Sequence, residues 1–250
     1  MELAPTAGIA SNPVGLVEPL LKPPTRLLVV GVLLWLGACF GRCTKKEEPP
    51  HEEIIPVGSV SLPKVLIVGD SISEGYYPYV RSNLVNVAET HRPEGNHGAT
   101  WDGLKHLEEW LEGRDWNVIH FNFGLHDIHR STLEQYEANL TQIVAQLKKS
   151  KARLIFATST PVLEGTPTFL KGSATPYNEV ARRVMERAGG IALDDLHSFA
   201  SAHPEYQRPK DLHFTDQGYA ALGNEVADSI VRALGGTQAS STASSSRSSP

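Results

Sequence analysis

Cysteine is scarce in this chain of 250 residues, which has only Cys39 and Cys43, both near the N-terminus. Two cysteines cannot form a disulfide framework, and the rest of the chain has no thiol for a cysteine-based zinc site. A basic excess is also lacking, because the formal net charge is −5. Phosphate binding needs a basic face, so we expect no nucleic acid partner.

Motifs of several enzyme classes are missing as well. The absence of a Gly-x-Ser-x-Gly elbow argues against an α/β-hydrolase, and the absence of Gly-x-Gly-x-x-Gly and P-loop patterns argues against a nucleotide site. The close spacing of His126, Asp127 and His129 leaves a metal in that loop as an alternative. Without a His-Glu-x-x-His pattern, however, the residues imply no metal and no organic cofactor.

Long hydrophobic runs are few. The 15 residues between Arg26 and Arg42 carry no charge. As a helix they would extend about 22 Å, which is short of the ~30 Å hydrocarbon core. A basic flank, a short apolar stretch and small residues before a cut favour a secretory signal over a stable membrane span.

Leu36-Gly37-Ala38-Cys39 resembles the bacterial lipoprotein signal, in which cleavage precedes a cysteine that carries lipid. We therefore expect lipidation at Cys39 and an exported protein, periplasmic or at the cell surface, with its N-terminus anchored to the membrane. The alternatives are an uncleaved anchor, another type of signal, a mis-assigned start codon and a cytosolic protein.

Composition divides the chain into three parts. Residues 1–57 form the signal-like segment and a polar tether, residues 58–236 form one domain, and residues 237–250 form a serine-rich tail predicted to be disordered. The middle part is long enough to bury a substantial core. We expect the protein to act as a monomer.

Within the middle part, apolar runs alternate with helical patterns. Buried strands are predicted at 64–69, 117–123 and 153–158, with weaker ones at 84–88 and 190–193. Helical spacing is found at 102–112, 132–149, 176–188 and 215–234. This alternation predicts a three-layer α/β/α domain, with a parallel sheet covered on both faces.

The residues that follow the strands are the place to look for chemistry, because ligands bind at the carboxyl ends of parallel strands. Four segments stand out there and near the end of the domain: Gly69-Asp70-Ser71, Asn96-His97-Gly98, Gly124-Leu125-His126-Asp127, and Asp211-Leu212-His213 followed by Phe-Thr-x-x-Gly. Taken alone, the Asp-Ser pair is typical of a helix N-cap, and the histidine before Thr-x-x-Gly is the more specific signal.

In this order the segments resemble the SGNH (GDSL-like) hydrolase family over about residues 65–222. Two positions depart from the family pattern. His126 stands where the third block has asparagine, and Lys210 stands where the family has an aspartate three residues before His213. Asp211 supplies an acid two residues before His213 instead. The chain looks like a subset in which Gly-Leu-His-Asp and Asp-x-His-Phe-Thr occur together.

The resemblance implies a flavodoxin-like parallel sheet of about five strands and a serine esterase. Ser71 would be the nucleophile, with Ser73 as the alternative, and His213 would be the base. Asp211 would orient His213, with Asp127 as the alternative acid.

The resemblance also implies an oxyanion hole. Its donors would be the backbone N–H groups of Ser71 and Gly98, together with the ring of His126 in place of the asparagine. The alternative for His126 is a buried structural histidine bonded to backbone, in which case Asn122 or a backbone amide would be the next candidate donor.

The expected reaction is hydrolysis of a carboxylic ester through an acyl-serine intermediate, on a small-molecule or glycan ester. No long hydrophobic insertion separates the blocks, which favours a small acyl group such as acetyl on a carbohydrate. Lipid and thioester substrates stay open. The alternative function is a catalytically inactive glycan-binding module on the same fold, which the two departures from the family pattern would explain.

Overall fold

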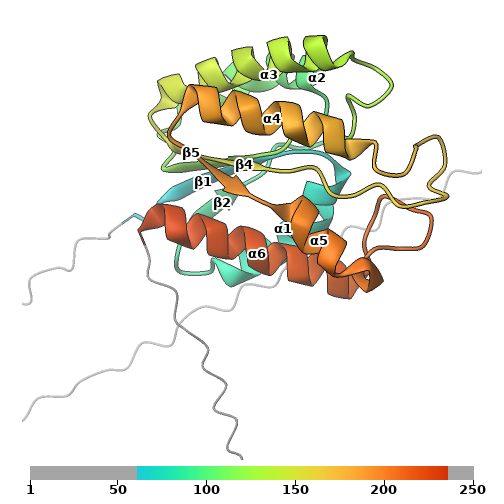
Figure 1. Cartoon of the computed structure of the whole chain (residues 1–250). Coiled ribbons are helices and arrows are strands. Elements are labelled where there is room, and N and C mark those ends of the chain that lie inside the picture. The colour runs from blue at the N-terminus through green and yellow to red at the C-terminus, as the bar shows by residue number, and fades with distance from the viewer. Residues whose placement is uncertain (1–60, 236–250) are drawn as a thin grey trace, which may run out of the picture. The chain divides into compact units, whose positions relative to one another are not determined.

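The structure is a computed structural model that describes residues 61–235 (Figure 1). Residues 1–57 and 237–250, and with them Cys39, lie outside the described residues. One parallel sheet has the strand order β2-β1-β3-β4-β5, which is the flavodoxin-like order. The predicted fold class is therefore confirmed. The strands are β1 (Lys64–Val68), β2 (Glu89–His91), β3 (Val118–Phe121), β4 (Arg153–Ala157) and β5 (Ile191–Asp194).

Two layers of helices enclose the sheet (Figure 1). One layer contains α1 (Ser71–Asn83), α5 (Leu196–Ala202) and α6 (Asp216–Leu234). The other contains α2 (Thr100–Leu111), α3 (Leu133–Leu147) and α4 (Ala174–Ala188). Single 3-10 turns follow α3 at Lys148–Ser150 and α5 at Pro204–Tyr206. Within residues 61–235, no helix combines the length and apolar character that a membrane crossing requires.

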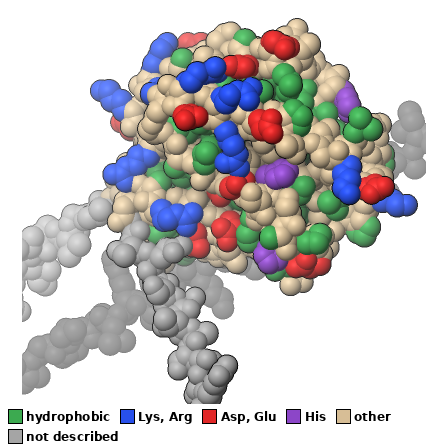
Figure 2. All heavy atoms as spheres, in the orientation of Figure 1, with side chains coloured by type: hydrophobic (Ala, Val, Ile, Leu, Met, Phe, Trp, Pro, Cys, Tyr) green, Lys and Arg blue, Asp and Glu red, His purple; other side chains and the backbone are tan. Residues whose placement is uncertain are grey.

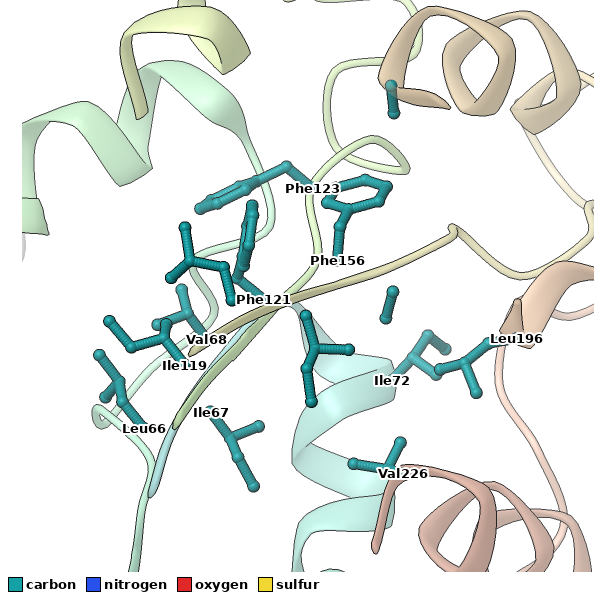
Figure 3. Close-up of a cluster of buried hydrophobic side chains, with 14 of the residues drawn as sticks. Leu66, Ile67, Val68, Ile72, Ile119, Phe121, Phe123, Phe156, Leu196 and Val226 are labelled. Atoms are coloured by element: carbon teal, nitrogen blue, oxygen red, sulfur yellow. The ribbon is translucent and has the colours of Figure 1, made fainter. Parts of the chain in front are cut away.

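The hydrophobic core lies on both faces of the sheet. Phe121, Phe123 and Phe156 lie together on one side of the sheet, while Ile67 lies on the other side with Ile72, Leu196 and Val226 from the helices (Figure 3). Both faces of β1 are covered, so four consecutive apolar residues are buried there, as the continuous apolar run predicted. Burying each large aliphatic or aromatic side chain contributes about 1.5–3 kcal/mol.

One polar cluster is buried inside this core. His120 on β3 is fully buried, and its Nε2 lies 2.9 Å from Oδ2 of Asp194 at the end of β5. The hydroxyl of Ser229 on α6 donates to the same carboxylate oxygen at 3.1 Å. These contacts join β3, β5 and α6, so His120 has a structural partner in an otherwise apolar strand.

The strand predicted at 84–88 is wrong. Leu84 ends α1, its N–H donating to Val80 O, and Asn86 takes a left-handed conformation with φ of 62°. Val85 and Val87 are exposed rather than paired. The strand that follows α1 is instead β2 (Glu89–His91), at one edge of the sheet, and its polar residues form no apolar run. Helix α5 was not predicted either, because seven residues are too few to show helical periodicity.

The surface carries charge of both signs. On the face shown in Figure 2, lysine and arginine side chains are interspersed with aspartate and glutamate. No extended patch of one sign is visible on that face.

Candidate active site

Ser71 lies where β1 ends and α1 begins. Asp70 is the N-cap of α1, and its Oδ1 accepts the N–H of Ile72 at 2.9 Å. Ser71 is therefore the first residue of the helix, at the carboxyl edge of the sheet. Its N–H belongs to the first turn, whose donors have no acceptor within the helix. Burial raises the pKa of Asp70, while the electrostatic interaction with His126 and the hydrogen bond from the N–H of Ile72 act in the opposite direction.

Three residues from the two ends of the domain form a continuous chain of hydrogen bonds. Ser71 Oγ lies 3.0 Å from His213 Nε2. His213 Nδ1 lies 2.8 Å from Asp211 Oδ1, which also accepts the backbone N–H of His213 at 3.2 Å. The hydrogen bond from His213 holds the pKa of Asp211 below its ordinary value, so the carboxylate is ionised at neutral pH.

The sequence after His213 explains how the histidine is held. Thr215 is the N-cap of α6, and its hydroxyl accepts the N–H of Gly218 at 3.1 Å. A side chain at Gly218 would collide with the carbonyl oxygen of Tyr206, so only glycine allows this close approach. On the other side, the carbonyl of His213 accepts the N–H of Arg208 at 2.9 Å. The Thr-x-x-Gly pattern therefore fixes the start of α6 at Asp216, close to the histidine.

Gln207 is a positioning residue that the sequence did not reveal. Its buried side-chain amide donates to the carbonyl of Pro161 at 3.0 Å and to that of Asp211 at 2.9 Å. These bonds join the loop after β4 to the turn that carries Asp211. A glutamine in a polar loop has no distinctive sequence signal, so only the contacts identify it.

Ser73, the alternative nucleophile, does not take part in this chain of hydrogen bonds. It is buried, its hydroxyl donates to the backbone carbonyl of Asp70 at 2.6 Å, and it accepts from Arg92 Nε at 3.2 Å. Arg92 also donates to the carbonyl of Gly95 at 2.9 Å. The arginine thus joins the turn before Ser71 to the loop after β2, a role that no sequence motif indicated.

Gly98 lies between the turn at Asp70 and the ring of His126. A Cβ at Gly98 would overlap the side chain of Asp70 and come within 2.9 Å of His126 Cδ2. The position therefore requires glycine. His126 is half-buried, and within residues 61–235 neither of its ring nitrogens has a hydrogen-bond partner. The alternative of a buried structural histidine bonded to backbone is thus not what the geometry shows. Asn122, the next candidate donor, is already bonded, its amide donating to the carbonyl of Ala157 at 2.7 Å.

Asp127 connects the two loops that carry Gly98 and His126. One carboxylate oxygen accepts the N–H of Thr100 at 2.9 Å, and the other accepts the hydroxyls of Thr100 at 2.5 Å and Ser131 at 3.0 Å. Burial raises the pKa of Asp127, and the bonds from Thr100 oppose that shift. With both oxygens engaged, Asp127 is not the partner of His213.

The metal alternative at His126, Asp127 and His129 finds no support in the geometry. The carboxylate of Asp127 is occupied by hydroxyl and amide donors. His129 is exposed, with its ring 5.6 Å from that of Phe169. These three residues do not form a ligand set in the described part of the chain.

The arrangement suits nucleophilic chemistry. A serine hydroxyl at a helix N-terminus is hydrogen-bonded to an imidazole, and the other ring nitrogen of that imidazole is bonded to an ionised carboxylate. This order of groups can activate the hydroxyl as a nucleophile and stabilise the imidazolium that forms.

Solved structures of known proteins share the fold. No curated protein matches the chain significantly. Among solved structures, the lipase/acylhydrolase from Enterococcus faecalis is similar with 21% identity and a TM-score of 0.60, covering 68% of this chain and 95% of that one. Axe2, an acetylxylan esterase from Geobacillus stearothermophilus, is similar with 18% identity and a TM-score of 0.56, covering 71% and 96%.

The psychrotrophic esterase EstA from Pseudoalteromonas sp. shares the fold too, with 16% identity and a TM-score of 0.56 over 69% of this chain and 98% of that one. The model of the GDSL-like Lipase/Acylhydrolase family matches residues 67–221. Because this match covers more than half of the chain, the chain belongs to the GDSL-like lipase/acylhydrolase family and is a hydrolase.

Proposed function

We propose that the protein is a serine esterase that hydrolyses a carboxylic ester through an acyl-serine intermediate. The observation that carries this proposal is the hydrogen-bonded chain from Ser71 through His213 to Asp211 at the carboxyl edge of the sheet. Asp211 takes the orienting role although it lies two residues before His213, because the turn lets one carboxylate oxygen reach both N–H groups of His213.

In the first half of the reaction, Ser71 Oγ attacks the ester carbonyl carbon while His213 Nε2 takes the hydroxyl proton. The carbonyl π electrons move to the oxygen, giving a tetrahedral oxyanion. The C–O bond to the alcohol then breaks, and His213 returns the proton to the departing oxygen. The products of this half are a free alcohol and an acyl ester on Ser71.

In the second half, His213 takes a proton from water as the water oxygen attacks the acyl carbon. The bond to Ser71 Oγ breaks, His213 returns the proton to that oxygen, and a carboxylic acid leaves. Asp211 stays ionised throughout and stabilises the imidazolium in both halves.

The oxyanion is stabilised by donors placed before the reaction begins. The N–H of Ser71 lies at the N-terminus of α1, and Gly98 and His126 lie beside the turn that precedes it. The half-buried ring of His126 has free nitrogens that can donate to the oxygen, in the role the family assigns to asparagine. A neutral imidazole offers one donor, so its tautomer decides which nitrogen does so.

The proposed substrate is a small acyl ester, with acetyl groups on a carbohydrate first among the candidates. An acetylxylan esterase is among the proteins of the same fold, and the loops that follow the strands lack a long apolar insertion. We also propose export with a lipid at Cys39 and action as a monomer. Support for the export comes from the sequence before residue 57.

The test is hydrolysis of p-nitrophenyl esters of graded acyl length and of acetylated sugars by the full-length protein. Among the p-nitrophenyl esters, the wild type should hydrolyse the acetate ester fastest. Ser71→Ala should lose nearly all activity. Ser82→Ala, at an exposed position of the same helix, is the matched control and should keep full activity. A fluorophosphonate probe should label the wild type and the control, but not Ser71→Ala. Glycan binding without turnover or labelling would instead support the inactive binding module.

A further inference from the structure

A second cluster of titratable side chains lies outside the proposed catalytic residues. It contains His97, in the loop that precedes α2, and Asp102 and His106 on α2 itself. His97 Nδ1 lies 2.8 Å from Asp102 Oδ2, and His106 Nε2 lies 3.7 Å from Asp102 Oδ1. One ligand atom from each residue can be chosen so that all three lie within 4.8 Å of one another.

These separations are close to those of a metal site. With bonds of about 2.0–2.2 Å, tetrahedral Zn²⁺ holds its ligand atoms roughly 3.4 Å apart. Asp102 and His106 are four residues apart on one helix, so they share a face. We therefore expect rotations of the three side chains to bring their ligand atoms to the distances of a metal site.

The outer contacts of the two histidines strengthen this interpretation. The second nitrogen of His97, Nε2, lies 2.7 Å from the carbonyl oxygen of Glu94. The second nitrogen of His106, Nδ1, lies 3.4 Å from Oε2 of Glu109. Histidines that bind metals usually donate their other ring N–H to a carbonyl or carboxylate, which fixes the tautomer and the ring orientation.

Neighbouring residues pack against the rings of His97 and His106, and a cavity beside them leaves room for a further ligand. Trp110 packs against both, with its ring 5.0 Å from that of His97 and stacked 5.9 Å from that of His106. His97 and His106 line a cavity of about 610 Å³. The side chains of His97, Asp102 and His106 are 16%, 20% and 38% exposed, so an ion could enter from solvent.

We propose that His97 Nδ1, the Asp102 carboxylate and His106 Nε2 bind a divalent transition-metal ion of the Zn²⁺ class. Two imidazole nitrogens and one carboxylate suit Zn²⁺, Co²⁺ or Ni²⁺ far better than Mg²⁺ or Ca²⁺, which prefer oxygen ligands. A water or a group from the cavity completes the coordination. The ion is separate from the Ser71 chemistry, and its binding does not depend on the proposed function.

Because of the position of His97, a bound ion would connect two segments of the domain. His97 directly precedes Gly98, and its backbone N–H donates to the carbonyl of Gly69 at 3.2 Å. A metal bond to its side chain would join the loop that carries Gly98 to the first two turns of α2. We therefore expect the bound ion to stabilise the folded domain, because a ligand that binds only the native state raises its stability.

The experiment uses full-length protein freed of metal with EDTA, in a Cys39→Ser/Cys43→Ser background so that thiols cannot bind the ion. Calorimetric titration with Zn²⁺ should show one site per chain, and Co²⁺ should give the visible absorption of a four-coordinate complex. Mg²⁺ should not bind. The melting temperature should rise with Zn²⁺ and return after EDTA is added.

The variants decide whether these three residues form the site. His106→Gln, at the most exposed of the three positions, should weaken Zn²⁺ binding at least ~10-fold, and Asp102→Asn should do the same. His91→Gln is the matched control, because His91 lines the same cavity outside the cluster, and should bind normally. Circular dichroism of the metal-free variants checks folding. Absence of saturable Zn²⁺ binding, or equal binding by folded His106→Gln and Asp102→Asn variants, would overturn the proposal. Both outcomes are independent of esterase activity.

Discussion

Asp211 Oδ1 lies 2.8 Å from Nδ1 of His213 and 3.2 Å from the backbone N–H of the same histidine. One carboxylate oxygen of Asp211 therefore orients the ring of His213 and also binds the backbone N–H of His213. The turn that makes this possible includes Lys210, which has a positive φ of 57°. The acid lies one position closer to the histidine than the family pattern has it, and the contact to the ring is nevertheless made.

Replacing Asp211 tests its orienting role. We expect Asp211→Ala to lower kcat about 10⁴-fold, less than Ser71→Ala or His213→Ala, because the nucleophile and base remain. Asp216→Ala, at an exposed position of α6, should have no effect. Steady-state kinetics on p-nitrophenyl acetate measures kcat of both variants, and an Asp211→Ala enzyme with the kcat of the wild type would mean that another group orients His213.

The proposed oxyanion donor is tested at His126. We expect His126→Ala to lower kcat by about 10²–10³-fold, with little change in KM, because the donor acts on charge that develops in the transition state. His126→Asn should keep more activity than His126→Ala, since its amide supplies a donor at the family's position. The melting temperatures of both variants should stay near that of the wild type. Unchanged kcat, or an unfolded His126→Ala protein, would rule out the role.

Asp127 should matter for both stability and rate, because it bonds the N-terminus of α2 to the loop after β3. Asp127→Ala leaves the buried donors of Thr100 without their acceptor, and we expect a loss of about 2 kcal/mol in the free energy of unfolding. The displacement of Gly98 and His126 should also lower kcat at least 10-fold. Urea unfolding and kinetics on the same sample check both. A stable variant with normal kcat would show that the loops hold their places without this carboxylate.

Asp195 gives a pH-dependent contribution to stability. Although burial alone would raise its pKa, hydrogen bonds from Ser198 and Arg182 lower it from 3.8 to about 2. A lowered pKa stabilises the fold above the unfolded value of 3.8, and this stabilisation is lost as the pH falls through 2. Asp195→Asn should therefore lower the free energy of unfolding by about 1 kcal/mol at pH 7, a value reduced for solvent screening.

The difference in the free energy of unfolding between Asp195→Asn and the wild type should shrink as the pH falls from 4 toward 2. Urea unfolding over a pH series measures it. Asp115→Asn, at an exposed position outside this network, serves as the control and should follow the wild type at every pH. If this difference in the free energy of unfolding grew as the pH fell, the pKa of Asp195 would not be lowered in the folded state.

The proposed lipid is tested at Cys39. Cys39→Ser should move the protein from the membrane to the soluble fraction and abolish incorporation of labelled palmitate, because a thiol is needed to carry the lipid. Cys43→Ser is the control and should leave both unchanged. Intact-mass analysis that finds Met1 retained, or a cut elsewhere, would refute the lipoprotein signal. The esterase activity of the released protein should be normal, since the tether precedes the domain.

The local patterns of the sequence were enough for the fold class. Continuous apolar runs at residues 64–69 and 153–158 predicted the buried parallel strands that the structure has as β1 and β4, and helical spacing at 132–149 predicted the covering helix α3. The polar edge strand at 89–91 and the short helix at 196–202 were not predicted. An edge strand needs no apolar run because one side is open, and a short helix contains too few turns for its periodicity to show.

The sequence alone also determined which residue types stand at the carboxyl ends of the strands, Ser71 and His126 among them, because the chain order of strands and loops is local information. Only the tertiary structure decided their partners. It brought His213 to within 3.0 Å of Ser71 across 142 positions of sequence, assigned Asp127 to Thr100 rather than to His213, and placed His97 beside Asp102. Hydrogen bonds depend on distance and direction in space, and those are set only when the packed layers close around the sheet.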